Sequence, residues 1–241
     1  ISGCVRAVNI TSSYNKGGCD AAGMIECVWH NAKVTITDCV VKGKFTATTE
    51  KGKRYMAGFV RDQYAPCTLT NCLYVGTNNA ENNGDRTNTF AHNATLNNCH
   101  YLNACGKAQG TQVTAERLKS GYVAHKLQGT REETVWGQVL GTDTIPQPTA
   151  DAAKRVRKVD FTYKNDVKAT RYANDGKSIH GGMPTFTAKD LLGTGYNPHH
   201  YYAIAFEGGF NASTPVNADR KVDITLAEKD CYEIASKENW K

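Results

Sequence analysis

Nine cysteines give this chain its most reactive side chains, because a thiol can bind a soft metal, form a disulfide or act as a nucleophile. No two of them have the Cys-x-x-Cys spacing of zinc ribbons and thioredoxin-like sites. Cys4, Cys39, Cys72 and Cys99 instead each end a recurring phrase of one aliphatic and two small polar residues. This pattern predicts inward-pointing reduced thiols that stack on one another. Disulfides among the other cysteines remain an alternative if the protein is exported.

The histidine pair His199-His200 is the best candidate for metal binding in the second half of the chain. Neighbouring side chains on a strand point to opposite faces, so the two rings cannot easily reach one ion. His180 is the only other histidine in this region. We therefore expect ordinary surface or turn roles for these histidines, and no metal site.

Paired carboxylates would suggest glycoside cleavage, which needs two acids facing each other across a cleft. No acid in the first 110 residues recurs at an equivalent position in neighbouring repeats; these acids are Asp20, Glu26, Asp38, Glu50, Asp62, Glu81 and Asp85. The sequence also lacks the motifs of phosphate loops, nucleophile elbows and zinc peptidases. We expect a protein that is not an enzyme, with no catalytic residue and no cofactor. A carbohydrate-active enzyme, a glycoside hydrolase or lyase, is the alternative.

Four tyrosines, Tyr55, Tyr64, Tyr74 and Tyr101, are spread over the repeats. Exposed in a row they would favour binding of glycans or proteins, because tyrosine combines a large contact area with a polar hydroxyl. Ordinary packing is the other interpretation, and it is the one we favour for Trp136. The sequence identifies no ligand-binding residue.

The charge pattern bears on the classes of partner. The formal net charge is +6, and the basic residues are scattered apart from the cluster at 154–158. Nucleic-acid binders usually concentrate such residues on one face, so we expect no nucleic-acid partner. No stretch approaches the roughly 18 consecutive apolar residues of a membrane helix, so we expect no membrane span.

The repeated phrase also predicts the fold. Cysteine-ending phrases recur every 27 to 35 residues, and Ala22-Gly23 and Ala57-Gly58 open a second repeated pattern. Repeats of this length are typical of stacked coils. We predict a mainly β fold, with a parallel β-helix (β-solenoid) over about 1–112. Asp38 occupies the slot held by Gly3, Asn71 and Asn98 in the other repeats, which indicates a turn.

Beyond the repeats, one helix is predicted over 114–128, with Thr114 as its N-cap and Gly129 as its stop. We expect this helix and Trp136 to cap the open end of the coil. The prolines at 145–149 predict the domain boundary, which gives domains over 1–145 and 146–241. Strands near 156–163, 168–172, 201–206 and 221–226, and a short helix at 187–192, predict a small β-rich module.

The steps Ala22-Gly23-Met24-Ile25 and Ala57-Gly58-Phe59-Val60, each followed by a cysteine phrase, resemble the GLUG repeat. That repeat occurs in large bacterial surface and secreted proteins, including some IgA-cleaving metallopeptidases. The C-terminal module resembles the β-grasp-like repeats of surface proteins such as internalins, and 232–240 is similar to the start of another GLUG array. The resemblance implies a cell-surface or secreted segment of a longer chain, and transfers no catalytic residue.

The resulting expectation is a non-enzymatic extracellular segment of a bacterial surface protein. It would act as an adhesin-like surface for glycans or for host or other extracellular proteins, or as a spacer.

Overall fold

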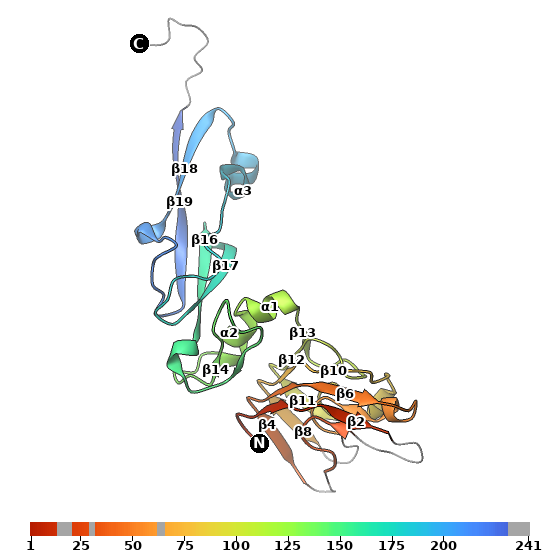
Figure 1. The fold of residues 1–241 in the computed structure, drawn as a ribbon. Coiled ribbons are helices and arrows are strands. Elements are labelled where there is room, and N and C mark those ends of the chain that lie inside the picture. Colours follow the sequence, from red (N-terminus) through yellow and green to blue (C-terminus); the bar gives the residue numbers. More distant parts are fainter. Residues whose placement is uncertain (14–20, 29–31, 62–65, 231–241) are drawn as a thin grey trace, which may run out of the picture. The chain divides into compact units, whose positions relative to one another are not determined.

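The computed structural model describes residues 1–13, 21–28, 32–61 and 66–230 of the chain. The chain divides into two compact units, Ile1–Val156 and Arg157–Lys241. Both are rich in strands (Figure 1). Each unit is described separately below.

Short strands and a few short helices build the first unit. The strands are β1 (Val5–Ala7), β2 (Ile10–Ser12), β3 (Ala21–Ala22), β4 (Val34–Thr37), β5 (Val40–Lys42), β6 (Lys44–Ala47), β7 (Met56–Ala57), β8 (Cys67–Thr70), β9 (Leu73–Tyr74), β10 (Thr77–Asn78), β11 (Ala94–Asn97), β12 (His100–Tyr101), β13 (Thr111–Gln112), β14 (Trp136–Gly137) and β15 (Gln147–Pro148). The helices are η1 (Gly52–Arg54), η2 (Gly84–Arg86), α1 (Ala115–Lys119), α2 (Tyr122–Gln128) and η3 (Ala152–Lys154).

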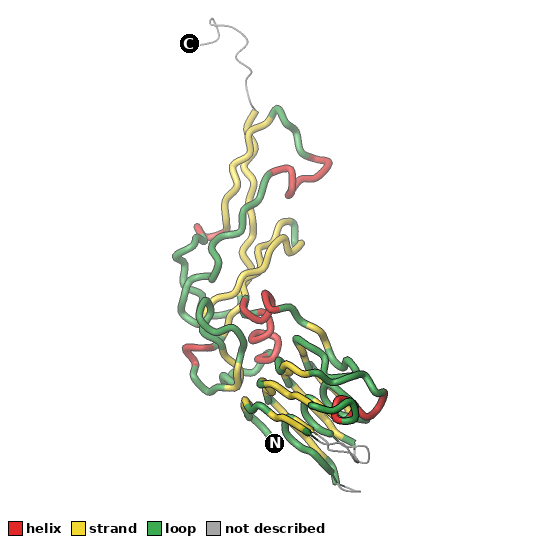
Figure 2. Tube along the Cα trace, turned by 45° about the vertical axis from the view of Figure 1, so that its right-hand side comes forward, coloured by secondary structure: helices red, strands yellow, loops and turns green. Residues whose placement is uncertain are grey.

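Most of these strands form small parallel sheets, and equivalent strands of successive repeats are neighbours (Figure 2). The sheet orders are β1-β5-β9-β12-β13, β10-β6-β2, β11-β8-β4 and β3-β7. The register aligns the repeats: Val5 faces Val40, and Val40 faces Leu73. The pair β14-β15 is antiparallel, so the proline segment at 147–148 is held against Trp136 and Gly137.

The predicted fold class, a parallel β-solenoid with a helical cap followed by a β-grasp-like module, is wrong. The described residues are mainly β with few helices, but their sheets are small and separate, and most of them are parallel or mixed. The repeated phrases do specify local turns and the pairing of neighbouring repeats. They do not specify a single coil closed at its end by a helix. The helices α1 and α2 pack against the five-stranded sheet instead.

The helical segment packs on the outer side of the five-stranded sheet. Leu118, Val123 and Leu127 form one cluster with Val40 of β5 and Leu73 of β9. The placement follows from the strands, where Val40-Val41 and Leu73-Tyr74 are consecutive buried pairs. A strand that is apolar on both faces needs cover on both. The expected cap over the end of the repeats is therefore wrong.

The helix predicted over 114–128 is divided at Gly121, whose φ of 91° interrupts the helical backbone. The predicted ends are confirmed: Thr114 accepts a hydrogen bond from the Arg117 amide, and Gly129 is the C-cap of α2. The turn prediction is also confirmed. Gly3, Asp38, Asn71 and Asn98 all have positive φ, a region that asparagine and aspartate tolerate better than other non-glycine residues.

The second unit is a four-stranded mixed sheet, in the order β17-β16-β19-β18. Its elements are β16 (Val156–Tyr163), β17 (Asp166–Asn174), α3 (Ala188–Leu192), η4 (Gly193–Gly195), β18 (His200–Phe206), η5 (Glu207–Gly209) and β19 (Arg220–Asp230). β16 is parallel to β19, and β18 is antiparallel to it. The strands and the short helix predicted here are confirmed as elements.

The core of this unit gathers around Phe161. Its ring meets Phe206 and Phe210 edge to face, at centroid distances of 5.5 and 5.7 Å. Leu191 of α3 and Ile224 of β19 belong to the same buried cluster. A capping box formed by Thr187 and Asp190 starts α3 and so fixes where Leu191 enters the core.

Candidate functional site

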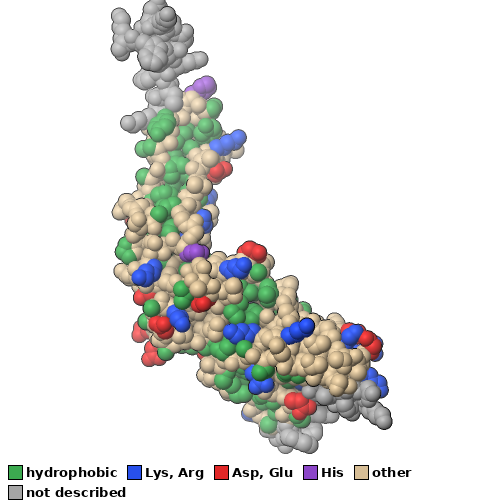
Figure 3. All heavy atoms as spheres, in the orientation of Figure 1, with side chains coloured by type: hydrophobic (Ala, Val, Ile, Leu, Met, Phe, Trp, Pro, Cys, Tyr) green, Lys and Arg blue, Asp and Glu red, His purple; other side chains and the backbone are tan. Residues whose placement is uncertain are grey.

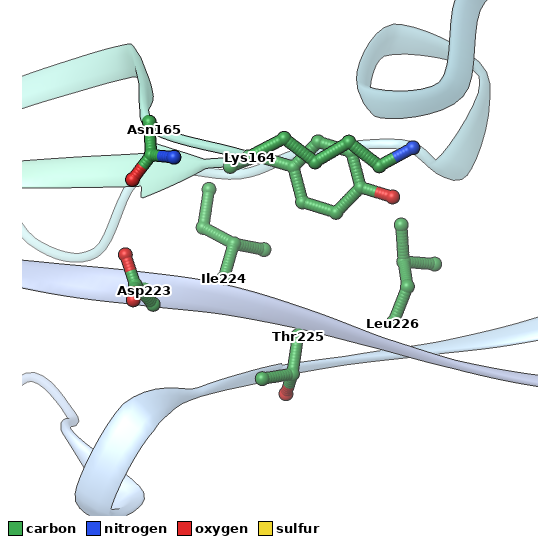
Figure 4. A pocket seen from close by; sticks show the side chains of 7 residues that line it. Lys164, Asn165, Asp223, Ile224, Thr225 and Leu226 are labelled. Atoms are coloured by element: carbon green, nitrogen blue, oxygen red, sulfur yellow. The ribbon is translucent and has the colours of Figure 1, made fainter.

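A groove beside β19 is the clearest candidate for a binding site in the second unit (Figure 4). Its volume is about 420 Å³. The lining residues come from the end of β16, from the turn after it and from the middle of β19; they are Tyr163, Lys164, Asn165, Asp223, Ile224, Thr225 and Leu226.

The groove exists because two paired strands have unequal lengths. β19 has eleven residues, but β16 pairs with it only from Arg220 to Asp223. β16 ends at Tyr163 because Lys164 and Asn165 both have positive φ, 51° and 70°. Two such residues in succession make the tight reversal typical of two-residue hairpins.

Past Asp223, β19 pairs with β18 alone within the part of the chain that the structure describes. The ladder with β18 runs from Ile224 opposite Phe206 to Asp230 opposite His200. The other edge of β19, which faced β16, has no strand beside it over these described residues. Main-chain N–H and C=O groups along such an edge are available to another strand.

The floor of the groove is apolar and its rim is charged. Ile224 is only 4% exposed and Leu226 is half-buried, and both belong to or pack against the core. The ammonium of Lys164 lies 5.4 Å from the centroid of the Tyr163 ring, and Figure 4 shows the side chain extended above Ile224. The Asp223 carboxylate accepts a hydrogen bond from the Thr162 hydroxyl. The groove therefore offers an apolar floor between a cation and an anion.

The opposite face of the β18–β19 ribbon is also open. Ala203, Ala205, Thr225 and Ala227 are exposed, and Tyr201 is 61% exposed. These residues alternate along the strands and so share one face. Apolar side chains reach the surface of this unit on the side drawn in Figure 3.

His200 belongs to a polar cluster with Glu228 and Tyr202. Its Nδ1 hydrogen-bonds the Glu228 carboxylate, and the Tyr202 hydroxyl donates to the same oxygen at 3.2 Å. The hydrogen bond from His200 holds the pKa of Glu228 below its ordinary value. Among the described residues, no three His, Cys, Asp or Glu side chains are placed to hold one ion.

Three of the carboxylates considered for glycoside cleavage make ion pairs. Glu50 pairs with Lys53 and Glu81 with Arg54, on exposed surface. Glu26 is exposed. Asp20 and Asp62, together with the side chain of Asp85, lie outside the described residues.

Among the described acids of this set, Asp38 is the buried one, and it anchors the helical segment. Arg131 Nη1 lies 2.8 and 2.9 Å from the two carboxylate oxygens of Asp38, and Trp136 Nε1 donates to Oδ1 at 2.7 Å. Arg131 also donates to the carbonyl oxygens of Leu127 and Gln128 at the end of α2. We interpret this cluster as structural, because the Asp38 carboxylate accepts hydrogen bonds from Arg131 and Trp136, and Arg131 also binds the end of α2. Trp136 is fully buried, which confirms its packing role.

The tyrosines do not form an exposed row. Tyr74 is fully buried and Tyr101 is 7% exposed. Tyr55 accepts a hydrogen bond from Arg86 at 2.5 Å. Tyr64 lies outside the described residues. Packing explains Tyr74 and Tyr101, so they offer no platform for stacking sugars.

The thiols of the repeated phrase behave as expected at three of four positions. Cys39, Cys72 and Cys99 are buried, and the Cys72 and Cys99 thiols each donate to a main-chain oxygen of the preceding repeat. Cys4 is exposed, contrary to expectation. None of the described cysteines is in a disulfide. Burial raises the pKa of the Cys39 thiol, and raises that of Cys105 to about 12, which leaves both in the unreactive neutral form.

Comparison with family models, with curated proteins and with solved structures finds no match for this chain. No helix among the described residues is long and apolar enough to cross a bilayer. The groove itself escaped the sequence interpretation. The one sequence signal that bears on it is the predicted end of the strand near 156–163, and the sequence did not indicate that β19 continues beyond the pairing with that strand.

Proposed function

We propose that this chain is a non-enzymatic, extracellular segment of a bacterial surface protein, and that its second unit binds protein partners in the manner of an adhesin. The single observation that carries the binding role is the β18–β19 ribbon, which leaves one edge and one face of β19 open beside the groove. An open strand edge is a surface that soluble proteins usually shorten, charge or cover. A long open edge with an apolar groove is therefore suited to a partner.

A protein partner is favoured over a glycan. Sugar recognition by stacking needs exposed aromatic faces, and the repeat tyrosines Tyr74 and Tyr101 are buried. The groove instead combines main-chain groups with the apolar side chains of Ile224 and Leu226. Main-chain pairing with alternating side-chain contacts is a common mode of peptide recognition.

The extracellular part of the proposal rests on the resemblance to the GLUG repeat, and the structure supplies a physical reason for its Ala-Gly steps. A Cβ on Gly23 would lie 2.0 Å from the Gly58 oxygen, and one on Gly58 would lie 2.1 Å from the Thr89 oxygen. Successive repeats approach so closely at this row that only glycine fits. In the next repeat, Thr89 stands at the position that follows Gly23 and Gly58. Its main-chain oxygen is the atom that a Cβ on Gly58 would overlap.

The test is a binding screen with the recombinant chain immobilised on a surface. One arm is a panel of purified extracellular proteins and the other is a glycan array. Saturable binding to a protein that is lost when the second unit is blocked by antibody supports the proposal. Binding to glycans alone would refute the protein-binding role and favour a glycan-binding surface. Binding to nothing in either arm would refute it and favour a spacer.

A further inference from the structure

We infer that the open edge of β19 from Ile224 to Glu228 binds an extended peptide segment of a partner protein as an added strand, on the track that β16 leaves at Tyr163. This inference rests on the proposed protein-binding function and specifies the chemistry of the partner. The partner segment has alternating apolar side chains and an acidic group near one end.

The first argument is continuity with an existing ladder. Val159 to Thr162 of β16 already pair in parallel with Arg220 to Asp223 of β19. The hairpin at Lys164-Asn165 then removes β16 while β19 continues straight. An added strand would occupy the next positions of the same ladder and would meet the same strand spacing.

The second argument is length. The open stretch from Ile224 to Glu228 spans five residues, about 17 Å of extended chain. That is the usual length of a strand in globular proteins. Every second residue along such an edge turns its N–H and C=O outwards, so an added strand gains two or three pairs of main-chain hydrogen bonds.

The third argument is the chemistry of the side-chain sites. Ile224, Leu226 and the Tyr163 ring lie on the groove side and would contact apolar side chains of the added strand. Thr225 is exposed and Ala227 is small and exposed, so the other side of the strand meets no bulky obstacle. Steric room on one side and apolar contact on the other require an alternating partner sequence.

The fourth argument is charge. Lys164 is exposed, its ammonium contacts the Tyr163 ring, and it has no carboxylate partner among the described residues. It lines the groove, and Figure 4 shows its side chain extended above Ile224. An acidic side chain or a terminal carboxylate on the partner would complete this contact. Asp223, held by Thr162, disfavours a second acid further along.

The test uses synthetic ten-residue peptides with alternating valine and threonine and one terminal aspartate, labelled with a fluorophore. Two further versions carry N-methyl groups on either the odd or the even main-chain amides. The two versions have the same composition and differ only in which edge of the peptide is blocked. Binding to the full chain is followed by fluorescence anisotropy, and protection of β19 amides by hydrogen exchange.

Strand addition predicts that one N-methylated series binds like the parent and the other at least about tenfold more weakly, since two or three hydrogen bonds are lost. It also predicts new protection confined to residues 224–228. Lys164→Glu should weaken the aspartate peptide about threefold or more, and Lys177→Glu, an exposed lysine outside the groove, should not.

Several outcomes would overturn the inference. They are equal binding of both N-methylated series, no binding of any peptide up to millimolar concentration, and protection in the free chain of those amides of residues 224–228 that do not face β18. A dimer formed through β19 would do the same by assigning the edge to a second copy. Failure of the proposed function is distinguishable from failure of this inference. A partner protein that binds Lys164→Glu and wild type equally would exclude the groove as its site and leave the proposed function intact, whereas the absence of any protein partner in the binding screen would refute the proposed function itself.

Discussion

The substitution Asp38→Asn tests whether one buried carboxylate holds the helical segment against the five-stranded sheet. Asparagine tolerates the φ of 53° at this turn, as Asn71 and Asn98 do at the equivalent turns. The change therefore removes charge without straining the backbone. It leaves one acceptor oxygen where there were two, and turns an amide NH₂ towards Arg131 or Trp136, both of which are donors.

The magnitude follows from the burial of the partners. Breaking a fully buried ion pair from one side costs about 3 to 5 kcal/mol. The Arg131 side chain is 32% exposed, so water recovers part of its solvation, and Arg131 keeps its bonds to the end of α2. We expect Asp38→Asn to lower the free energy of unfolding by about 2 kcal/mol.

Urea denaturation followed by circular dichroism measures this change, and hydrogen exchange of α1 and α2 locates it. Asn93→Asp makes the reverse exchange at an exposed residue with a φ of 48°, so it should stay within about 0.5 kcal/mol of wild type. A cycle with Arg131→Met isolates the pair. A cost under about 0.5 kcal/mol for Asp38→Asn, or additive single changes in the cycle, would refute the reasoning.

Three further outcomes are expected. Gly58→Ala should lower the free energy of unfolding in urea by at least about 3 kcal/mol, because its Cβ would overlap a main-chain oxygen. The control Gly195→Ala, whose Cβ meets no atom within 4 Å, should change it little, and similar stabilities of the two variants would contradict the close approach of the repeats. Carbon-13 NMR should show the Glu228 carboxyl titrating with a pKa below 4.5, and His200→Ala should raise that pKa. The contact therefore stabilises the fold at neutral pH, and this stabilisation is lost as the pH falls through the lowered pKa. An unchanged titration in His200→Ala would exclude the contact. A thiol reagent at mildly alkaline pH should label Cys4 quickly and Cys105 only after unfolding, and equal labelling rates by mass spectrometry would contradict the burial of Cys105.

Local features of this fold were accessible from the sequence because they depend on few neighbouring residues. The positive-φ turns at Asp38 and Asn71, the N-cap at Thr114 and the strands of the second unit all follow from short patterns. Burial of Cys39, Cys72 and Cys99 followed from their repetition. Such patterns either recur along the chain or differ from the residues around them, so local structure can be predicted from them.

The arrangement of the sheets and the position of the helices were not accessible in the same way. The contact between Asp38 and Arg131 spans 93 residues, and no repeat or motif marks Arg131. Val40 and Leu73 carried a signal for a covered outer face, since each precedes a second buried residue. That signal does not say which later segment supplies the cover. The fold class was wrong for this reason.

The reversal at Lys164-Asn165 has a consequence for variation of this protein. Lengthening the hairpin by one residue on each arm would carry β16 past Asp223 and close part of the groove, without altering any side chain on β19. Shortening it would uncover more. The position of this one chain reversal thus sets how much of the β19 edge is open to other molecules. Insertions and deletions in the hairpin can change that length without changing the residues of β19 at the contact.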